Sequence, residues 1–205
     1  MDGLNPNIVE WGVAGRQMPG ETLSGDLHLV KPVDQGALIA VADGLGHGKA
    51  AADAARLALN AVEECAHNPL VRMLEHCSQR LLQTRGVVMS LALLNALDNT
   101  MEWLGVGNVE GLLVRSAADG KRTIESLTLS PGVVGTRLPP LRAAALKVAP
   151  GDTLIFATDG IRRGFEEEMR FFATPDKTAQ AILARDCLGT DDALVLIATY
   201  QGRPR

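Results

Sequence analysis

The spacing of the strand-like segments is the feature that most limits how this chain can fold. Four such segments follow one another between residues 87 and 129, separated by linkers of only a few residues. Asp98-Asn99 and Asp119-Gly120, which lie in these linkers, are typical of hairpin turns. Connections this short do not allow parallel pairing, so we expect the segments to pair as antiparallel strands.

Further strands and three helices are expected around this block. Apolar runs bounded by turn residues predict strands at 8–15, 26–31, 36–42, 87–94, 101–106, 111–115, 123–129, 153–157 and 193–199. Helices are expected at 49–66, 70–84 and 175–185. Clustered strands with separate helices predict an α+β fold, a sheet sandwich covered by helices. We find no internal repeat and no boundary, so residues 1–205 are expected to form a single domain.

Composition and charge narrow the class of protein. Apolar residues make up 46% of the chain and charged residues 21%, which allows a sizeable core and excludes a disordered chain. The net charge of −4 and the 3% of aromatic residues argue against a nucleic-acid partner. No apolar leader follows Met1, and no apolar run could span a bilayer. The chain is therefore expected to be cytoplasmic, with no membrane partner.

The cysteines indicate a reducing compartment. Cys65, Cys77 and Cys187 are too few, and odd in number, for a disulfide framework. Cys65, His67, His76 and Cys77 could in principle form a Cys₂His₂ zinc site. Their spacing matches no zinc-finger pattern, and we favour the interpretation that they are ordinary residues where two helices meet.

Aspartates stand at the edges of four apolar strands, usually beside glycine. The four sites are Ser24-Gly25-Asp26, Val41-Ala42-Asp43-Gly44, Ala157-Thr158-Asp159-Gly160 and Gly189-Thr190-Asp191-Asp192. Carboxylates at strand ends can converge on one rim of a sheet, where they repel one another and resist ionisation. Hard divalent cations such as Mg²⁺ and Mn²⁺ relieve that repulsion and prefer oxygen ligands. The alternative for each site is an ordinary Asp-Gly turn.

The glycine-rich string from Asp43 to Lys49 is not a nucleotide-binding loop. A Walker A loop would need glycine at Asp43 and a hydroxyl residue at Ala50. A dinucleotide fingerprint has the pattern G-x-G-x-x-G, whereas this chain has G-x-G-x-G. A cysteine phosphatase is also excluded, because none of the three cysteines is followed by arginine six residues later.

Asp43-Gly44-Leu45-Gly46-His47-Gly48 resembles the Asp-Gly-x-Gly-His-Gly signature of metal-dependent PPM-type serine/threonine phosphatases. The chain is most similar to their compact bacterial branch, which includes SpoIIE-like and RsbX-type stressosome phosphatases. Other matching segments follow in that family's order: Ser24-Gly25-Asp26, Gly105-Val106-Gly107-Asn108, Thr158-Asp159-Gly160 and Asp191-Asp192.

The resemblance implies two antiparallel β-sheets flanked by helices, and an enzyme. Its reaction would be hydrolysis of phosphoserine or phosphothreonine by a water activated between two metal ions, Mn²⁺ or Mg²⁺. Its substrates would be phosphorylated proteins of bacterial stress signalling, namely stressosome components. The alternative is a non-catalytic partner-binding module on the same fold.

The resemblance also implies residue roles. Asp43 and Asp159 would be catalytic. Asp43 would bridge the two metals, and Gly44 would bind one of them through its carbonyl. Asp159 and Asp191 would hold the other, and Asp26 would complete the cluster.

Residues beside this set have less defined roles. Asp192 is a less defined candidate than Asp191, because the family usually assigns the metal to the first acid of the pair. Leu194 stands where the family often has threonine. His47 could protonate the leaving oxygen, but we favour the interpretation that it orients its loop or faces solvent. Arg16 is a weak candidate for binding the substrate phosphate. Arg162 and Arg163 could contact an acidic or phosphorylated partner, although a solvated helix start is favoured. Glu166-Glu167-Glu168 is expected to be a solvated surface.

Overall fold

The computed structural model describes residues 8–116 and 121–203, and the expected Asp119-Gly120 turn lies outside them. Two five-stranded sheets form the centre of the molecule, and every strand pairing is antiparallel. The first sheet contains, in spatial order, β1 (Val9–Arg16), β10 (Ala193–Tyr200), β9 (Thr153–Ala157), β6 (Glu110–Ser116) and β7 (Arg122–Ser126). The second contains β2 (Asp26–Val33), β3 (Gly36–Gly44), β4 (Val87–Asn95), β5 (Thr100–Val106) and β8 (Ala144–Lys147).

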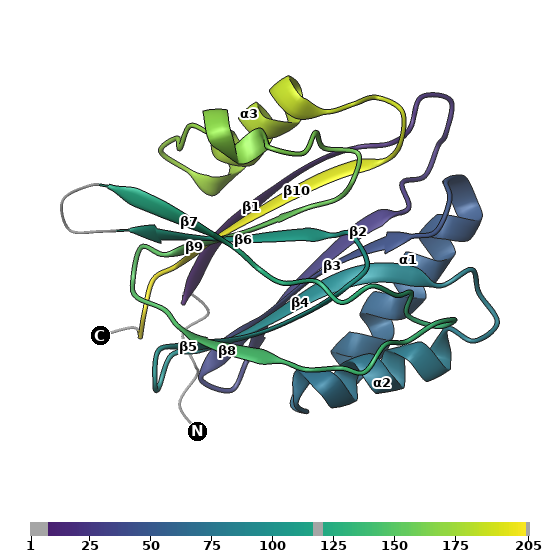
Figure 1. Cartoon of the computed structure of the whole chain (residues 1–205), viewed down its shortest axis with the longest axis horizontal. Helices are drawn as coiled ribbons and strands as arrows, with labels where there is room; N and C mark the ends of the chain where they lie inside the picture. The colour runs from purple at the N-terminus through teal and green to yellow at the C-terminus, as the bar shows by residue number, and fades with distance from the viewer. Residues whose placement is uncertain (1–7, 117–120, 204–205) are drawn as a thin grey trace.

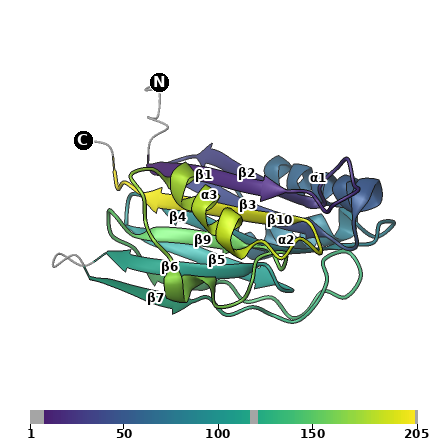
Figure 2. The same ribbon diagram turned by 90° about the horizontal axis from the view of Figure 1, so that it is seen from above.

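The helices cover the outer faces of the two sheets, as Figures 1 and 2 show. α1 (Gly48–Glu64) and α2 (Leu70–Arg80) pack on the second sheet, and α3 (Pro175–Asp186) packs on the first. A short 3₁₀ helix, η1 (Phe165–Glu168), lies beside α3. Three apolar clusters fill the spaces between these layers, the central one lying between the sheets. The predicted sandwich of two antiparallel sheets flanked by helices is confirmed.

Most strand limits agree with the sequence-based expectation to within one or two residues. The helix expected at 70–84 ends at Arg80, because the next residues form turns in which the Thr84 hydroxyl bonds to the Leu81 carbonyl and accepts from the Gly86 N–H. The strand expected at 123–129 ends at Ser126. β8 and η1 were not predicted: each has only four residues, which is too short for a clear period.

The alanine-rich face of α1 places this helix very close to the end of β3. Ala51, Ala54, Ala55 and Ala58 are fully buried against the second sheet. A Cβ atom added at Gly44 would lie 2.1 Å from the Ala51 carbonyl oxygen, so only glycine fits there. The small side chains therefore bring the helix to the strand end that carries Asp43.

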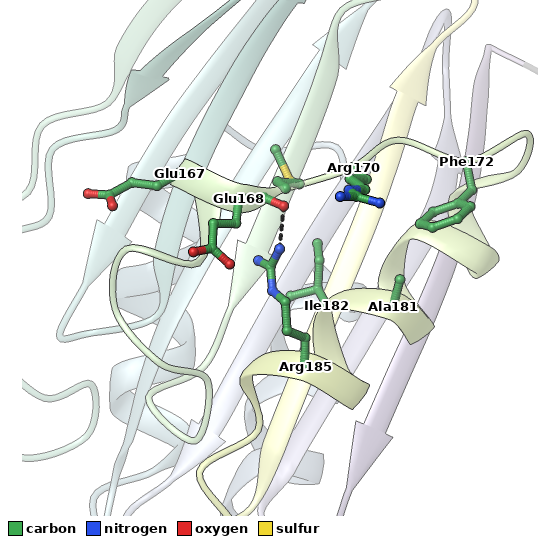
Figure 3. A pocket seen from close by; sticks show the side chains of 8 residues that line it. Glu167, Glu168, Arg170, Phe172, Ala181, Ile182 and Arg185 are labelled. Carbon is green, nitrogen blue, oxygen red and sulfur yellow. Dashed lines mark hydrogen bonds between the residues drawn. The ribbon is translucent and has the colours of Figure 1, made fainter.

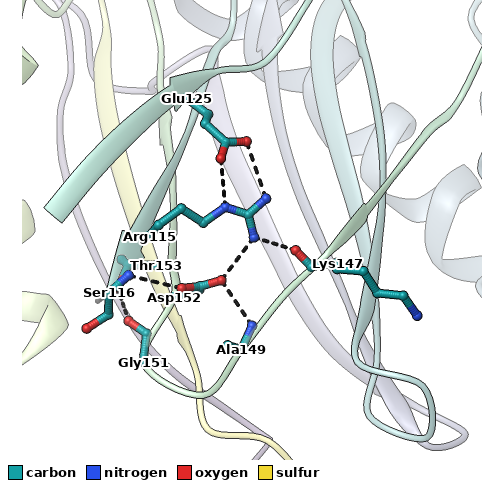
Figure 4. A network of polar contacts seen from close by, with 8 residues as sticks. All are labelled: Arg115, Ser116, Glu125, Lys147, Ala149, Gly151, Asp152 and Thr153. Carbon is teal, nitrogen blue, oxygen red and sulfur yellow. Dashed lines mark hydrogen bonds and ion pairs between the residues drawn. The ribbon is translucent and has the colours of Figure 1, made fainter. Parts of the chain in front are cut away.

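A polar network lies just before the start of β9, at the end of this strand remote from Asp159 (Figure 4). The Asp152 carboxylate, 4% exposed, accepts hydrogen bonds from the backbone N–H groups of Ser116 and Ala149, both at 3.0 Å. Arg115 pairs with Asp152 at 3.0 Å and with Glu125 at 2.9 Å. These bonds satisfy a buried charge and join β6, β7 and the turn before β9. No helix in the described part of the chain is long and apolar enough to cross a membrane.

Candidate metal centre

Asp26 and Asp43 lie directly opposite each other at one end of the second sheet. β2 and β3 are joined by a short turn, and the resulting register pairs Asp26 with Asp43. The Gly44 N–H donates to the Gly25 carbonyl at 3.0 Å, which extends this pairing by one step. The two strand-edge aspartates are thus neighbours because of the hairpin.

The first sheet brings Asp159 and Asp191 close to Asp26 and Asp43. The edge of the sandwich that carries these four aspartates is called the rim below. Asp159 follows β9, and Asp191 comes just before β10, the strand that pairs with β9. Thr158 joins the two sheets here: its hydroxyl donates to Asp26 Oδ2 at 2.7 Å and accepts from the Leu194 N–H at 2.8 Å. Leu194, which replaces the family's threonine, therefore contributes through its backbone.

The carboxylates of this rim make ionisation difficult for one another. Burial, followed by repulsion from Asp26, Asp159 and Asp191, raises the pKa of Asp43 to about 9. Burial also raises the pKa of Asp26 to about 7, although its hydrogen bond from Thr158 opposes this shift. The Asp43 carboxylate accepts no hydrogen bond from any residue in the described ranges, which is consistent with the larger rise of its pKa.

Asp159 is held from its other side by Asn108. The Asn108 side-chain amide donates to Asp159 Oδ2 at 2.7 Å. Burial and the nearby Asp191 raise the pKa of Asp159, and the bond from Asn108 opposes this rise. Asn108 belongs to the glycine-containing segment at 105–108, but sequence reasoning gave it no role at the site.

Both carboxylate oxygens of Asp192 are engaged by backbone N–H groups, which gives this residue a structural role. It is 3% exposed, and its two oxygens accept from the backbone N–H groups of Gly25 at 2.7 Å and Met18 at 2.8 Å. Its carboxylate thereby fixes the β1–β2 loop against the rim. Within the residues that the structure describes, the Asp191 carboxylate accepts a single hydrogen bond, from the Asp192 N–H at 2.8 Å, and the residue is partly exposed.

His47 and Arg16 border the rim. His47 precedes α1, and its Nδ1 lies 2.5 Å from Glu21 Oε1, so this contact joins the β1–β2 loop to the start of the helix. This placement supports the loop-orienting interpretation of His47. Arg16 is exposed at the end of β1, opposite Ala193, and makes no ion pair with any described residue.

The chemistry of the donor set suits a hard divalent cation, because every predicted side-chain ligand is a carboxylate. Asp26 and Asp159 are engaged by Thr158 and Asn108, and no three His, Cys, Asp or Glu side chains of the described ranges are grouped tightly enough to hold an ion. Burial and mutual repulsion raise the pKa of Asp43 to about 9, and a bound cation would relieve both effects. The residues therefore fit a hard divalent cation chemically.

The cysteine and histidine quartet does not come together. Cys77 is buried, with its thiol directed at the Ala58 carbonyl and the Met89 sulfur. His67 faces Asp34, and His76 faces Glu64. All three cysteines of the chain are free thiols. The favoured interpretation of these as ordinary residues is confirmed.

Two hollows lie on the side of the first sheet. One, of about 530 Å³, separates η1 from α3 and is lined by Glu167, Phe172 and Arg185 among others, but by none of the rim aspartates (Figure 3). Arg185 crosses it to donate to the Glu168 carbonyl. The second, of about 450 Å³, includes Asn108 in its lining and so borders the rim.

Comparisons with known proteins agree with the fold and the motif order. The family described as Stage II sporulation protein E (SpoIIE) matches residues 34–200. The phosphoserine phosphatase RsbX of Bacillus subtilis (strain 168) is 31% identical over 94 residues, which cover 46% of this chain and 47% of that relative.

Solved structures extend the similarity to nearly the whole chain. A chain from work on the bacterial stressosome, as a modular system adapted to control secondary messenger signalling, superposes with a TM-score of 0.83 at 30% identity, covering 93% of this chain and 98% of the other. RsbX in complex with magnesium superposes with a TM-score of 0.81 at 21% identity, covering 94% and 96%. The latter shows that the fold is shared.

Proposed function

The chain belongs to the SpoIIE family, and from that premise we propose that it is a metal-dependent protein serine/threonine phosphatase. The family assignment agrees with the resemblance noted in the sequence. The observation that carries the proposal is the meeting of Asp26, Asp43, Asp159 and Asp191 from both sheets at one rim. A folded protein retains such mutually repelling carboxylates where a cation offsets them.

In this proposal the carboxylates hold Mn²⁺ or Mg²⁺. Asp43 would bridge two ions, the Gly44 carbonyl would bind one, and Asp159 and Asp191 would hold the other, with Asp26 completing the set. When bound, the ions would supply a water of lowered pKa and positive charge beside the phosphoryl oxygens. RsbX, a protein of the same fold, has been solved with magnesium.

The chain's other residues position this set. Thr158 orients Asp26 through a 2.7 Å hydrogen bond, and Asn108 orients Asp159 at the same distance. Asp192 fixes the β1–β2 loop, so that the backbone at Gly25 cannot move away from Gly44. Groups of this kind set the direction of metal ligands without touching the metal.

We further propose phosphorylated stressosome components as substrates and the cytoplasm as the location. The substrate proposal rests on similarity to RsbX, a phosphoserine phosphatase, and to a chain solved in stressosome work. The location rests on three free thiols. We also propose that residues 1–205 form one phosphatase domain.

The test is a phosphatase assay on p-nitrophenyl phosphate and on a phosphoserine protein, with Mn²⁺, Mg²⁺ or EDTA. EDTA should abolish turnover, and Asp159→Asn should lower kcat by about 100-fold. Asp53→Asn, an exposed carboxylate on the outer side of α1, is the matched control and should leave kcat unchanged. Turnover that persists in EDTA, or Asp43→Asn with the wild-type rate, would overturn the proposal. Calorimetry that detects no Mn²⁺ binding would instead favour the partner-binding module.

A further inference from the structure

The hollow of about 450 Å³ beside the rim has no role in the reaction as proposed above. Its lining combines two apolar side chains, one amide and three charged side chains. These are Leu127, Leu129, Asn108, Glu110, Arg163 and Glu166. Asn108 connects it to the candidate centre, since the same side chain donates to Asp159. A substrate bound at the rim could therefore extend into this hollow.

Secondary structure fixes the charged residues around the hollow. Glu110 begins β6 and pairs in register with Ala157, two residues before Asp159. Arg163 and Glu166 come from the segment that follows Asp159-Gly160, and Glu166 lies in η1. The two glutamates thus reach one hollow from two elements that both start at the rim.

The charge in this hollow is not internally balanced. Glu166 Oε2 is enclosed by protein and accepts no hydrogen bond within the described residues. The earlier interpretation of Glu166 as part of a solvated surface is therefore wrong, whereas Glu167 and Glu168 are exposed. Arg163 is exposed and forms no ion pair with a described carboxylate.

The electrostatics of Glu110 show the same imbalance. Burial raises the pKa of Glu110, repulsion from Glu166 raises it further, and Arg163 opposes both. One cation at a distance does not neutralise two neighbouring carboxylates, so the hollow keeps a negative field. A bound positive charge would be favoured there.

The residues that line the hollow determine which kind of positive charge it can bind. The hollow offers two carboxylate side chains, Glu110 and Glu166, with the Arg163 guanidinium beside them, a set poorer in oxygen ligands than a hard metal ion prefers. The half-buried side chains of Leu127 and Leu129 offer an apolar wall. Lysine and arginine combine an apolar stem with a charged end and bury the stem along such walls.

We propose that this hollow is a substrate subsite that receives a lysine or arginine side chain flanking the phosphorylated residue. Glu110 binds the positive end, the charge of Glu166 adds to the attraction, and Leu127 and Leu129 pack against the stem. The inference rests on the proposed phosphatase function and adds a specificity to it. Arg163, which repels a cation, would limit the strength of this preference.

The test measures kcat/KM for phosphoserine peptides in which one flanking position carries lysine, alanine or glutamate, scanned over three positions on each side. Wild type should prefer lysine over alanine at one position by about threefold to fivefold. Glu110→Gln and Glu166→Gln should each reduce that lysine-to-alanine ratio toward one, and Arg163→Gln should increase it. Glu168→Gln, in the same short helix but outside the hollow, should keep the wild-type ratio.

A ratio that is unchanged in Glu110→Gln and Glu166→Gln, or a preference for glutamate, would overturn the subsite. Because the readout is a ratio on one enzyme, a general loss of activity or stability does not imitate the expected result. If the wild-type protein hydrolyses no phosphopeptide with Mn²⁺, the phosphatase proposal fails. The subsite is then tested by fluorescence anisotropy, with unphosphorylated peptides of the same sequences. Peptides that carry lysine should then bind the wild-type protein more tightly than they bind the Glu110→Gln or Glu166→Gln protein. Equal binding to all three proteins would reject the subsite.

Discussion

Replacing the Asp43 carboxyl group with an amide should stabilise the metal-free protein. Asp43→Asn keeps the size of the side chain but deletes a carboxylate whose pKa is raised from 3.8 to about 9, mainly by burial and then by Asp26. At pH 7 the unfolded chain is ionised at this residue, whereas the folded chain must take up a proton. The distance from 3.8 to pH 7 corresponds to about 4 kcal/mol of lost stability, at about 1.4 kcal/mol per pH unit.

The sign of this effect fixes its pH dependence. A carboxyl with a raised pKa in the folded state costs nothing below the unfolded value of 3.8, and its cost grows as the pH rises toward about 9. The asparagine amide gains no partner and returns about 1–2 kcal/mol, leaving a net gain of about 2 kcal/mol at pH 7. For a chain of this size, that is a rise in Tm of about 4–8 °C. At pH 5 the gain should nearly vanish.

The assay is thermal unfolding followed by circular dichroism, in EDTA at pH 7 and pH 5, and again with Mn²⁺ at pH 7. If Asp43 bridges the ions as proposed, Mn²⁺ should raise the Tm of the wild type more than that of Asp43→Asn, which lacks this carboxylate. Asp34→Asn, an exposed carboxylate in the β2–β3 turn, is the control and should melt like wild type in every condition. If Asp43→Asn melts at or below the wild-type temperature in EDTA at pH 7, the reasoning about the rim is refuted.

Three further predictions follow from the same contacts. If Asp26 and Asp43 bind the ion as proposed, Mn²⁺ affinity measured by calorimetry should rise by about tenfold per pH unit between pH 7 and 8, where Asp43 releases its proton, and more steeply below pH 7, where Asp26 releases one as well. Asp192→Ala should lower the free energy of unfolding by about 2–3 kcal/mol in urea, even in EDTA, because two backbone N–H groups lose their acceptor. Arg115→Ala should cost about 2 kcal/mol in urea through the buried Asp152 charge, and a change in Mn²⁺ affinity would contradict its remote position.

The convergence of Asp26 and Asp43 could be predicted from the sequence because local signals determine it. Both residues stand at strand edges, and the turn between their strands is short enough to permit only one close register. The antiparallel pairing of the strands between residues 87 and 116 was predictable for the same reason. Long, strongly patterned elements with short connections leave few alternative arrangements.

The different structural roles of neighbouring residues could not be predicted from local sequence signals. Asp191 and Asp192 are adjacent and chemically identical, and only the family resemblance separated them. In the structure, the separation follows from the β1–β2 loop, whose backbone N–H groups reach Asp192 from residues more than 160 positions away. Thr158 and Asn108 are further cases, since their contacts with Asp26 and Asp159 depend on how two sheets meet. Such contacts leave no local pattern.

The same long-range contacts explain how a fold can tolerate a rim of repelling carboxylates. Strands that carry like charges could relieve the repulsion by moving apart, but at this rim several bonds oppose that movement. The Thr158 hydroxyl joins Asp26 to the backbone of β10, and Asp192 anchors Gly25. A Cβ atom at Gly160 would lie 2.0 Å from the Asp192 carbonyl oxygen, so the backbone there is also in close contact. With the backbone held in this way, the remaining means of relief are uptake of a proton or of a cation, and a raised pKa and an affinity for divalent ions are two consequences of one arrangement.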